Sequence, residues 1–215
     1  MTSRRGPRDV KWVVKLGGSL AGSSALADWL ETLRAGAGRI VLVPGGGPFA
    51  DQVRAAQRQT GFDDRVAHHL ALLAMEQFGR MLAGLAPDLL MAAASKQAIR
   101  QALRQGAVPV WLPTRMALGR PEIPESWDVA SDSLALWLAG RLGARELVLI
   151  KSAPAPAGSL SAAGLAARGL IDAAFPAFLA KTQCRAWYAG PDGRARLAAG
   201  LSGDSEPGTP IAKMV

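Results

Sequence analysis

The chain has 215 residues, of which 49% are hydrophobic and 20% are charged, a composition that favours one compact domain and excludes an intrinsically disordered chain. Its 25 basic and 17 acidic residues give a net charge of +8, but the arginines are scattered and only 6% of residues are aromatic. Without a basic and aromatic platform we expect no nucleic-acid partner, and the positive charge suits attraction of a phosphorylated small molecule instead.

Short apolar strands alternate with amphipathic helices from the N-terminus onward. The first predicted strand, residues 12–16, ends at Gly17-Gly18 and precedes a helix over residues 25–35. The second predicted strand, residues 40–43, ends at Gly45-Gly46-Gly47 and leads directly into another helix. Each strand therefore delivers a glycine turn to the N-terminus of a helix.

The same alternation continues to the end of the chain. A long helix is predicted to begin near Asp63-Asp64, whose carboxylates suit a helix N-terminus, and to continue through Leu82. Further strands are predicted over residues 89–92, 108–112, 147–150 and 186–188, further helices over 96–104, 133–142 and 172–181, and loops over 113–127, 153–159 and 203–210. This order predicts an α/β fold, a three-layer αβα sandwich around a mostly parallel central sheet.

Nothing in the sequence resembles a targeting or membrane-spanning segment. No apolar run approaches the roughly 20 residues that cross a bilayer, and the charged N-terminus is unlike a secretory signal. The one cysteine, Cys184, cannot form an intramolecular disulfide. We therefore expect a cytoplasmic protein with no membrane partner, in which residues 1–10 form a flexible basic N-terminus and residues 11–215 a single domain.

The two glycine turns are the candidate binding site for an anion. In an open α/β sheet, ligands bind beyond the carboxyl ends of the strands, where helix N-termini direct backbone amides at anions. Glycine lets a phosphate approach the backbone because it has no Cβ. Lys15 lies within the first apolar strand, where a charge is costly without an anionic partner, although an ordinary edge lysine is the alternative interpretation.

Two common nucleotide-binding patterns are absent or incomplete. No G-x-x-x-x-G-K-S/T occurs in the chain, which excludes a P-loop nucleotidase. Residues 45–50 match the loose G-x-G-x-x-A form of the dinucleotide fingerprint, but Asp63 and Asp64 lie at a helix start rather than at the end of the following strand. A dehydrogenase is therefore only a remote alternative.

Three segments, taken together and in this order, resemble the signature segments of the amino-acid kinase family. They are Val13–Ser19, Val43–Ala50 and Ser131–Ala135. Gly208-Thr209 near the end resembles the C-terminal Gly-Thr element of that family, so the resemblance spans nearly the whole chain. It implies that residues 11–215 form a single amino-acid kinase domain, which we expect to assemble as a homo-oligomer.

Two further segments resemble one particular group of enzymes within this family. Ala67–Gln77 and Ser126–Ser133 look most like the (aminomethyl)furanmethanol phosphate kinases of methanofuran biosynthesis, whose bacterial relatives are associated with one-carbon metabolism. The resemblance implies an enzyme that transfers the γ-phosphoryl group of ATP, with Mg²⁺, to a small acceptor that is itself a phosphate monoester. Phosphoryl transfer depends mainly on positioning and charge neutralisation, which a lysine and glycine amides can supply.

The resemblance also assigns roles to residues. Lys15 would bind the transferring phosphates, Asp132 would organise that lysine and the metal, and Lys151 would supply a second cation. The implied cofactor-binding residues are Gly17, Gly18, Ser19, Ser131 and Ser133, and the implied substrate-binding residues are Gly45, Gly46, Gly47, His68 and Trp127. No metal site made by protein side chains is predicted, because His68 and its neighbour His69 point in different directions on a helix.

Some alternatives stay open at the level of sequence. Many family members have a Thr-Asp pair that helps to bind nucleotide where this chain has Lys151-Ser152, so the chain departs from the family pattern at the nucleotide site. The second transition-state lysine of many relatives has no clean match, and Lys151 could substitute for it or could equally be structural or solvent-exposed. Asp132 could also supply the N-terminal charge of the following helix, with Ser131-Asp132 as its cap, and both roles could hold together. Two functions therefore remain: an active small-molecule kinase, and a kinase-fold protein without nucleotide binding that acts as a binding or assembly subunit.

Overall fold

The computed structural model describes residues 10–213, so the predicted flexible N-terminus lies outside the described residues except for Val10. The strands are β1 (Trp12–Leu16), β2 (Ile40–Pro44), β3 (Leu90–Ala93), β4 (Val108–Trp111), β5 (Glu146–Ile150), β6 (Leu160–Ser161), β7 (Arg185–Ala189) and β8 (Thr209–Ala212). The α-helices are α1 (Leu26–Leu33), α2 (Gly47–Thr60), α3 (Asp64–Leu85), α4 (Lys96–Arg104), α5 (Thr114–Ala117), α6 (Ser131–Leu142), α7 (Ala162–Ala167), α8 (Phe175–Ala180) and α9 (Arg194–Ser202). None of these helices is both long enough and apolar enough to cross a membrane.

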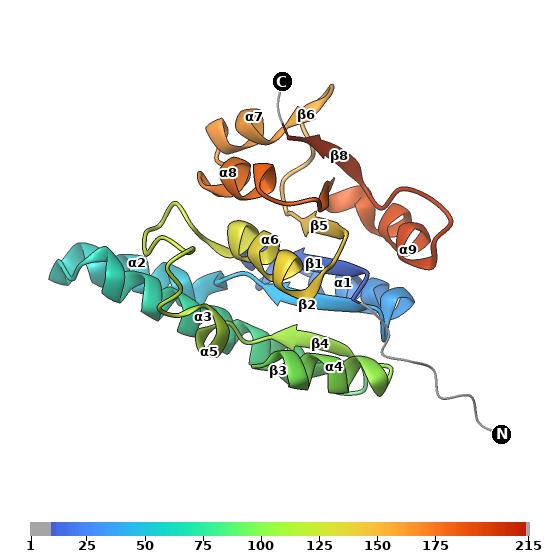
Figure 1. The fold of residues 1–215 in the computed structure, drawn as a ribbon, viewed down its shortest axis with the longest axis horizontal. Coiled ribbons are helices and arrows are strands. Elements are labelled where there is room, and N and C mark those ends of the chain that lie inside the picture. The colour runs from blue at the N-terminus through green and yellow to red at the C-terminus, as the bar shows by residue number, and fades with distance from the viewer. Residues whose placement is uncertain (1–9, 214–215) are drawn as a thin grey trace.

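The strands form one sheet in the order β3-β4-β2-β1-β5-β7-β8-β6 (Figure 1). All neighbouring strands are parallel except β7 and β8. The strands β1, β2, β5 and β7 consequently end at the same edge, and the turns that follow them converge there. The predicted α/β sandwich with a mostly parallel sheet is confirmed.

The alternation of side chains along each strand separates two hydrophobic layers. Val13 and Val41 belong to the layer beneath α6, whereas Val14 and Leu42 belong to the layer beneath α1 and α9. Lys15 has the same parity as Val13 and therefore faces α6. On β5, Leu147 and Leu149 also face α6, and Lys151 follows them with the same parity. The pleat alone thus directs both lysines to one side of the sheet.

The two glycine turns pack directly against each other. A Cβ built on Gly18 would lie 2.3 Å from the backbone nitrogen of Gly47, and one built on Gly45 would lie 2.4 Å from the nitrogen of Gly18. The turns are also tied to the sheet, since Gly45 N–H donates to Leu16 O at 2.9 Å. Glycine is therefore required here for contact between backbones, in addition to any approach of a phosphate.

The C-terminal third differs most from the sequence-based prediction. Strands β6 and β8 and helices α7 and α9 were not predicted, and α5 lies in a segment that was predicted as a loop. The alanine-rich α9 lacks a marked apolar face, and Pro210 within β8 argues against a strand. Pro210 is tolerated because β8 contributes only four residues and pairs antiparallel with β7. Helix α6 begins two residues before the predicted position, and α8 is shorter than predicted.

The interlocked turns lead to a stability prediction. We expect Gly18→Ala to lower the free energy of unfolding by about 1–3 kcal/mol, because its methyl group would collide with backbone that cannot rotate away. Gly22→Ala is the matched control, since nothing lies within 4 Å of a Cβ at that position. Denaturant unfolding of both variants checks this, and equal stability of the two would contradict the packing described here.

Candidate active site

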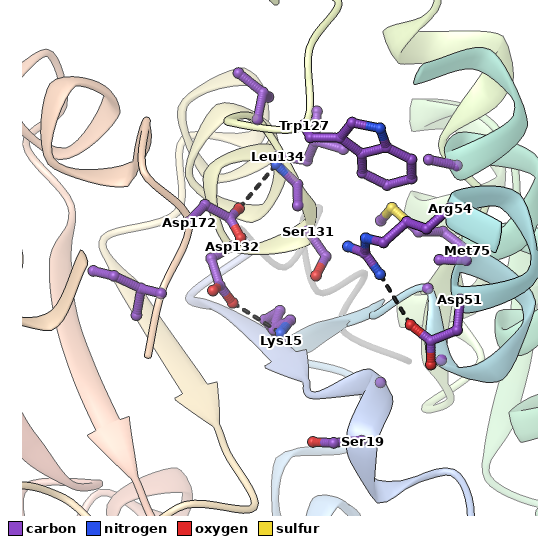
Figure 2. Close-up of a pocket in the computed structure, with 18 of the residues that line it drawn as sticks. Lys15, Ser19, Asp51, Arg54, Met75, Trp127, Ser131, Asp132, Leu134 and Asp172 are labelled. Carbon is purple, nitrogen blue, oxygen red and sulfur yellow. Dashed lines mark hydrogen bonds and ion pairs between the residues drawn. The ribbon is translucent and has the colours of Figure 1, made fainter. Parts of the chain in front are cut away.

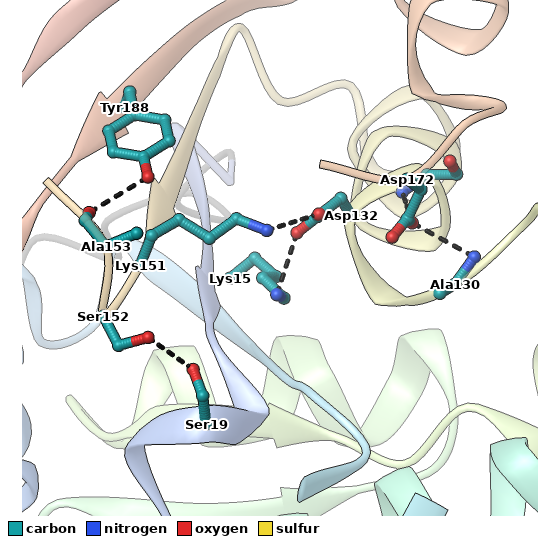
Figure 3. A network of polar contacts seen from close by, with 10 residues as sticks. Lys15, Ser19, Ala130, Asp132, Lys151, Ser152, Ala153, Asp172 and Tyr188 are labelled. Atoms are coloured by element: carbon teal, nitrogen blue, oxygen red, sulfur yellow. Dashed lines mark hydrogen bonds and ion pairs between the residues drawn. The ribbon is translucent and has the colours of Figure 1, made fainter. Parts of the chain in front are cut away.

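Two buried lysines meet on one carboxylate at the edge of the sheet (Figure 3). Lys15, from β1, places Nζ 2.8 Å from Asp132 Oδ1, and Lys151, directly after β5, donates from Nζ to Asp132 Oδ2 at 2.5 Å. Asp132 lies in the first turn of α6, and its side chain is only 2% exposed. The structure therefore brings together the three residues that were predicted as catalytic.

The charges in this cluster shift one another's ionisation. Burial by itself would raise the pKa of Asp132, but the positive charges of Lys15 and Lys151 outweigh it and hold the pKa at about 2. Burial, together with the neighbouring charge of Lys15, lowers the pKa of Lys151. With all three groups ionised the cluster carries one excess positive charge, which favours an incoming phosphate.

The N-terminus of α6 is capped from a distant part of the chain. Its N-cap residue is Ala130, which has no side-chain acceptor. The carboxylate oxygen Oδ2 of Asp172 accepts instead, from Ala130 N–H at 3.1 Å and from Ser133 N–H at 2.8 Å. The side chains of Ser131 and Asp132 therefore do not cap α6, since the carboxylate of Asp132 is paired with lysines, but Asp132 does place an acidic group in the first turn of the helix.

Asp172 was predicted as the start of a helix, yet it precedes α8 by three residues and faces the cluster. Burial and the negative charge of Asp132 raise the pKa of Asp172 to about 7, against the opposing charges of Lys15 and Lys151. Sequence reasoning missed its role, since the helix that it caps lies 39 residues earlier in the chain.

A cavity of about 310 Å³ opens beside the cluster, between α2 and α3 on one side and α6 with residues 169–172 on the other (Figure 2). Gly18, Ser19, Gly46, Gly47 and Ser131 line it, together with His68 and Trp127. His68 is buried and its Nε2 has no partner among the described residues, while burial lowers its pKa. The buried imidazole of His68 thus forms part of the cavity wall, with no hydrogen bond from Nε2 to the described residues.

An arginine that was not predicted lies in the same cavity. The guanidinium of Arg54, from α2, lies 4.4 Å from the centre of the Trp127 ring and 3.0 Å from Asp51 Oδ1. Trp127 is held in turn by Gln57, whose Oε1 accepts its indole N–H at 2.7 Å. Figure 2 shows the guanidinium beneath the ring and turned toward Ser131. Arg54 thus covers one face of the Trp127 ring. The ring is held by its hydrogen bond to Gln57, a residue 70 positions away in the sequence.

A second cavity, of about 350 Å³, lies beyond the ends of β5 and β7. Its lining includes Pro154-Ala155, residues 190–193 and Gly208-Thr209. The segment from Lys151 to Ala155 runs from the charged cluster to this cavity and is fixed on the way, since Ser152 Oγ lies 2.7 Å from Ser19 Oγ and Tyr188 Oη donates to Ala153 O at 3.0 Å. The cluster therefore belongs to the wall of the larger cavity, and the segment that follows Lys151 leads from it to the smaller one.

Three of the predicted binding residues do not line the larger cavity: Gly17, Gly45 and Ser133. Gly17 and Gly45 form the backbone of the turns, and Ser133 is fully buried with its N–H directed at Asp172. Within residues 10–213 no three histidine, cysteine or acidic side chains gather as they would around a metal ion.

Comparison with known proteins agrees with this geometry. The model of the amino acid kinase family matches residues 11–155, about two thirds of the chain, including β1, the glycine turns and the Asp132 segment. The chain belongs to the amino acid kinase family. Over 142 residues it is 27% identical to a (5-(aminomethyl)furan-3-yl)methyl phosphate kinase of Methanocaldococcus jannaschii, a match that covers 64% of this chain and 63% of that relative.

Solved structures in the comparison share the fold across almost the whole chain. A uridylate kinase from Archaeoglobus fulgidus superposes with a TM-score of 0.68 at 17% identity, covering 94% of this chain and all of the other. A UMP kinase from Ureaplasma parvum gives 0.70 at 13% identity, covering 95% and 99%. An isopentenyl phosphate kinase gives 0.61 at 16% identity, covering 94% and 100%. At these identities the likeness establishes the amino acid kinase fold.

The raised pKa of Asp172 leads to a prediction for stability against pH. Between about pH 4 and about pH 7 the folded chain retains a proton that the unfolded chain has released, so rising pH lowers the free energy of unfolding. Asp172→Asn cannot take up this proton, so its free energy of unfolding should not show this fall. We therefore expect the variant to become more stable relative to the unsubstituted protein as the pH rises through that range. Denaturant unfolding at pH 5, 6, 7 and 8 checks this, and parallel pH curves would contradict it.

Proposed function

We propose that this protein is an ATP-dependent phosphotransferase whose acceptor is a small molecule that already carries a phosphate. The observation that carries the proposal is the buried Lys15–Asp132–Lys151 cluster, which lines the larger cavity at the carboxyl edge of a parallel sheet and is joined to the smaller cavity by the segment after Lys151. A donor in the smaller cavity and an acceptor in the larger one would meet at the two lysines. Family membership supports the reaction class.

The cluster suits an in-line transfer of a phosphoryl group. Lys15 and Lys151 neutralise charge on the oxygens of the transferring group, while Asp132 keeps the two ammonium groups apart and aligned. An acceptor phosphate oxygen forms the new bond to phosphorus as the bond to the ADP oxygen breaks. A dianionic phosphate acceptor needs no base to remove a proton before it attacks.

The second cavity suits the nucleotide. Its walls combine Pro154-Ala155 with the glycines at 190 and 193, and a Cβ on Gly190 would come within 3.2 Å of Ala155 N. The Gly17–Ser19 turn, held to Ser152, leads from there to the lysines and would follow the triphosphate. Mg²⁺, when bound with the nucleotide, offsets phosphate charge, and within the described residues no preformed side-chain site for it exists.

The larger cavity suits an anionic acceptor of modest size. Arg54 supplies a guanidinium fixed by Trp127 and Asp51, and the turn at Gly46-Gly47 directs backbone amides into the same space. Leu72 and Met75 provide apolar surface for a ring. The Methanocaldococcus relative is named for an aminomethylfuran phosphate, and we propose the same acceptor, (aminomethyl)furanmethanol phosphate, in one-carbon cofactor biosynthesis. Cytoplasmic location and a homo-oligomeric state remain predictions.

A panel of acceptors tests the function. With Mg-ATP, the purified protein should form a diphosphate from (aminomethyl)furanmethanol phosphate, detected by mass spectrometry together with ADP. Lys15→Met should abolish product while leaving the melting temperature within a few degrees, because it removes a charge that the transferring phosphates require. Turnover of free amino acids or nucleoside monophosphates alone would sink the proposed acceptor, and undiminished turnover in Lys15→Met would sink the proposed site.

The same purified protein also distinguishes an active kinase from a binding or assembly subunit. Mg-ATP at 100 times its dissociation constant should stabilise a nucleotide-binding protein by about 2.7 kcal/mol. A protein that is neither stabilised by Mg-ATP nor active on any acceptor would favour the subunit over the kinase.

Arg54 gives a prediction specific to the acceptor. We expect Arg54→Met to raise the KM for the phosphorylated acceptor about tenfold or more, since a hydrogen bond to a charged group contributes about 1.5–3 kcal/mol. The KM for ATP should stay within twofold. Arg58→Met is the matched control, because Arg58 is exposed one turn further along α2 and does not line the cavity. Equal effects of both substitutions on the acceptor would argue against a role for Arg54.

A further inference from the structure

The position of Asp132 depends on a helix end that cannot cap itself. Asp132 is in the first turn of α6, where backbone amides lack partners within the helix. A local side chain can supply the missing acceptor, and in this chain Ser95 and Asp63 do so for α4 and α3. Ala130, at the same position of α6, has no side-chain oxygen.

Asp172 supplies the missing acceptor from the segment between α7 and α8. Its Oδ2 accepts both Ala130 N–H and Ser133 N–H, one on each side of Asp132 (Figure 3). A second link lies beside the first, since Ala174 N–H donates to Asp128 O at 2.9 Å. The start of α6 is thus joined twice to residues 172–174.

This arrangement has an evident electrostatic cost. The carboxyl of Asp172 is placed near that of Asp132, and the charge of Asp132 helps to raise the pKa of Asp172. A serine acceptor, as used at α4 and α7, would avoid this repulsion. A carboxylate at position 172, however, accepts both amides from another segment and so joins that segment to the helix, which a serine at the N-cap position would not do.

We propose that Asp172 is a positioning residue, which holds the first turn of α6 so that Asp132 pairs with both lysines. The expected effect of Asp172 on the reaction rate rests on the proposed phosphotransfer. Its support of the first turn of α6 does not depend on that function. Asp132 can accept Lys15 and Lys151 on separate oxygens only if its backbone is fixed relative to β1 and β5. Asp172 also belongs to the lining of the larger cavity, so the wall of that cavity and the alignment of the lysines share one support.

Two substitutions separate the hydrogen bonds from the charge. Asp172→Asn keeps an oxygen that can accept both amides, whereas Asp172→Ala removes the acceptor. We expect Asp172→Ala to lower kcat at least tenfold while the KM values for ATP and acceptor stay within threefold, and Asp172→Asn to retain at least half of the original kcat. Ser95→Ala, which removes a cap from α4 away from the cavities, should lower stability without changing kcat.

Hydrogen exchange at the Ser133 amide gives a readout that needs no activity. Protection should fall at least tenfold in Asp172→Ala and persist in Asp172→Asn. Unchanged protection or unchanged kcat in Asp172→Ala would overturn the proposal, as would an equal loss of kcat in Asp172→Asn with protection intact, which would assign the effect to the charge. If the unsubstituted protein transfers no phosphoryl group, the proposed function fails, and the exchange data alone decide the role of Asp172.

Discussion

The carboxylate of Asp132 holds two ammonium groups inside the protein, and the surrounding structure is arranged around that contact. Buried charges are strongly unfavourable unless they are paired in good geometry, so each partner must be delivered with little freedom. Lys15 comes from the next-to-last position of β1, Lys151 from the residue directly after β5, and Asp132 from the first turn of a helix on the same face. A parallel β1–β5 pair sets the two lysines on one side, and the crossing α6 brings the carboxylate between them.

Local sequence determinants pointed to part of this centre. The apolar strands and the glycine turns can be read within short windows and led to Lys15 and the turns, whereas Lys151 and the Asp132 segment entered through the family resemblance. Where the determinants were distant the reasoning failed. Asp172 caps a helix that begins 41 residues earlier, and the hydrogen bond between Trp127 and Gln57 joins residues that are 70 positions apart in the sequence. No local pattern encodes such contacts.

The same distinction explains the errors in the fold. Strands in the middle of the sheet are buried on both faces and form continuous apolar runs, as in β2 and β5, so they were predicted correctly. Strands β6 and β8 lie at one end of the sheet, have only two and four residues, and depend on pairing with each other. Their positions follow from tertiary context, which overrides the weak preference of Pro210 and its neighbours for a loop.

The mutual contact of the glycine turns restricts how this protein could diverge. No side chain can be added at Gly18 or Gly45 without displacing the other turn, so the part of the larger cavity formed by Gly18, Gly46 and Gly47 is fixed in shape. A change in what this cavity binds would therefore have to evolve in its other walls, at positions such as Arg54, His68 and Trp127. Descendants of this chain could come to hold a different molecule there while the paired lysines and Asp132 stayed unchanged.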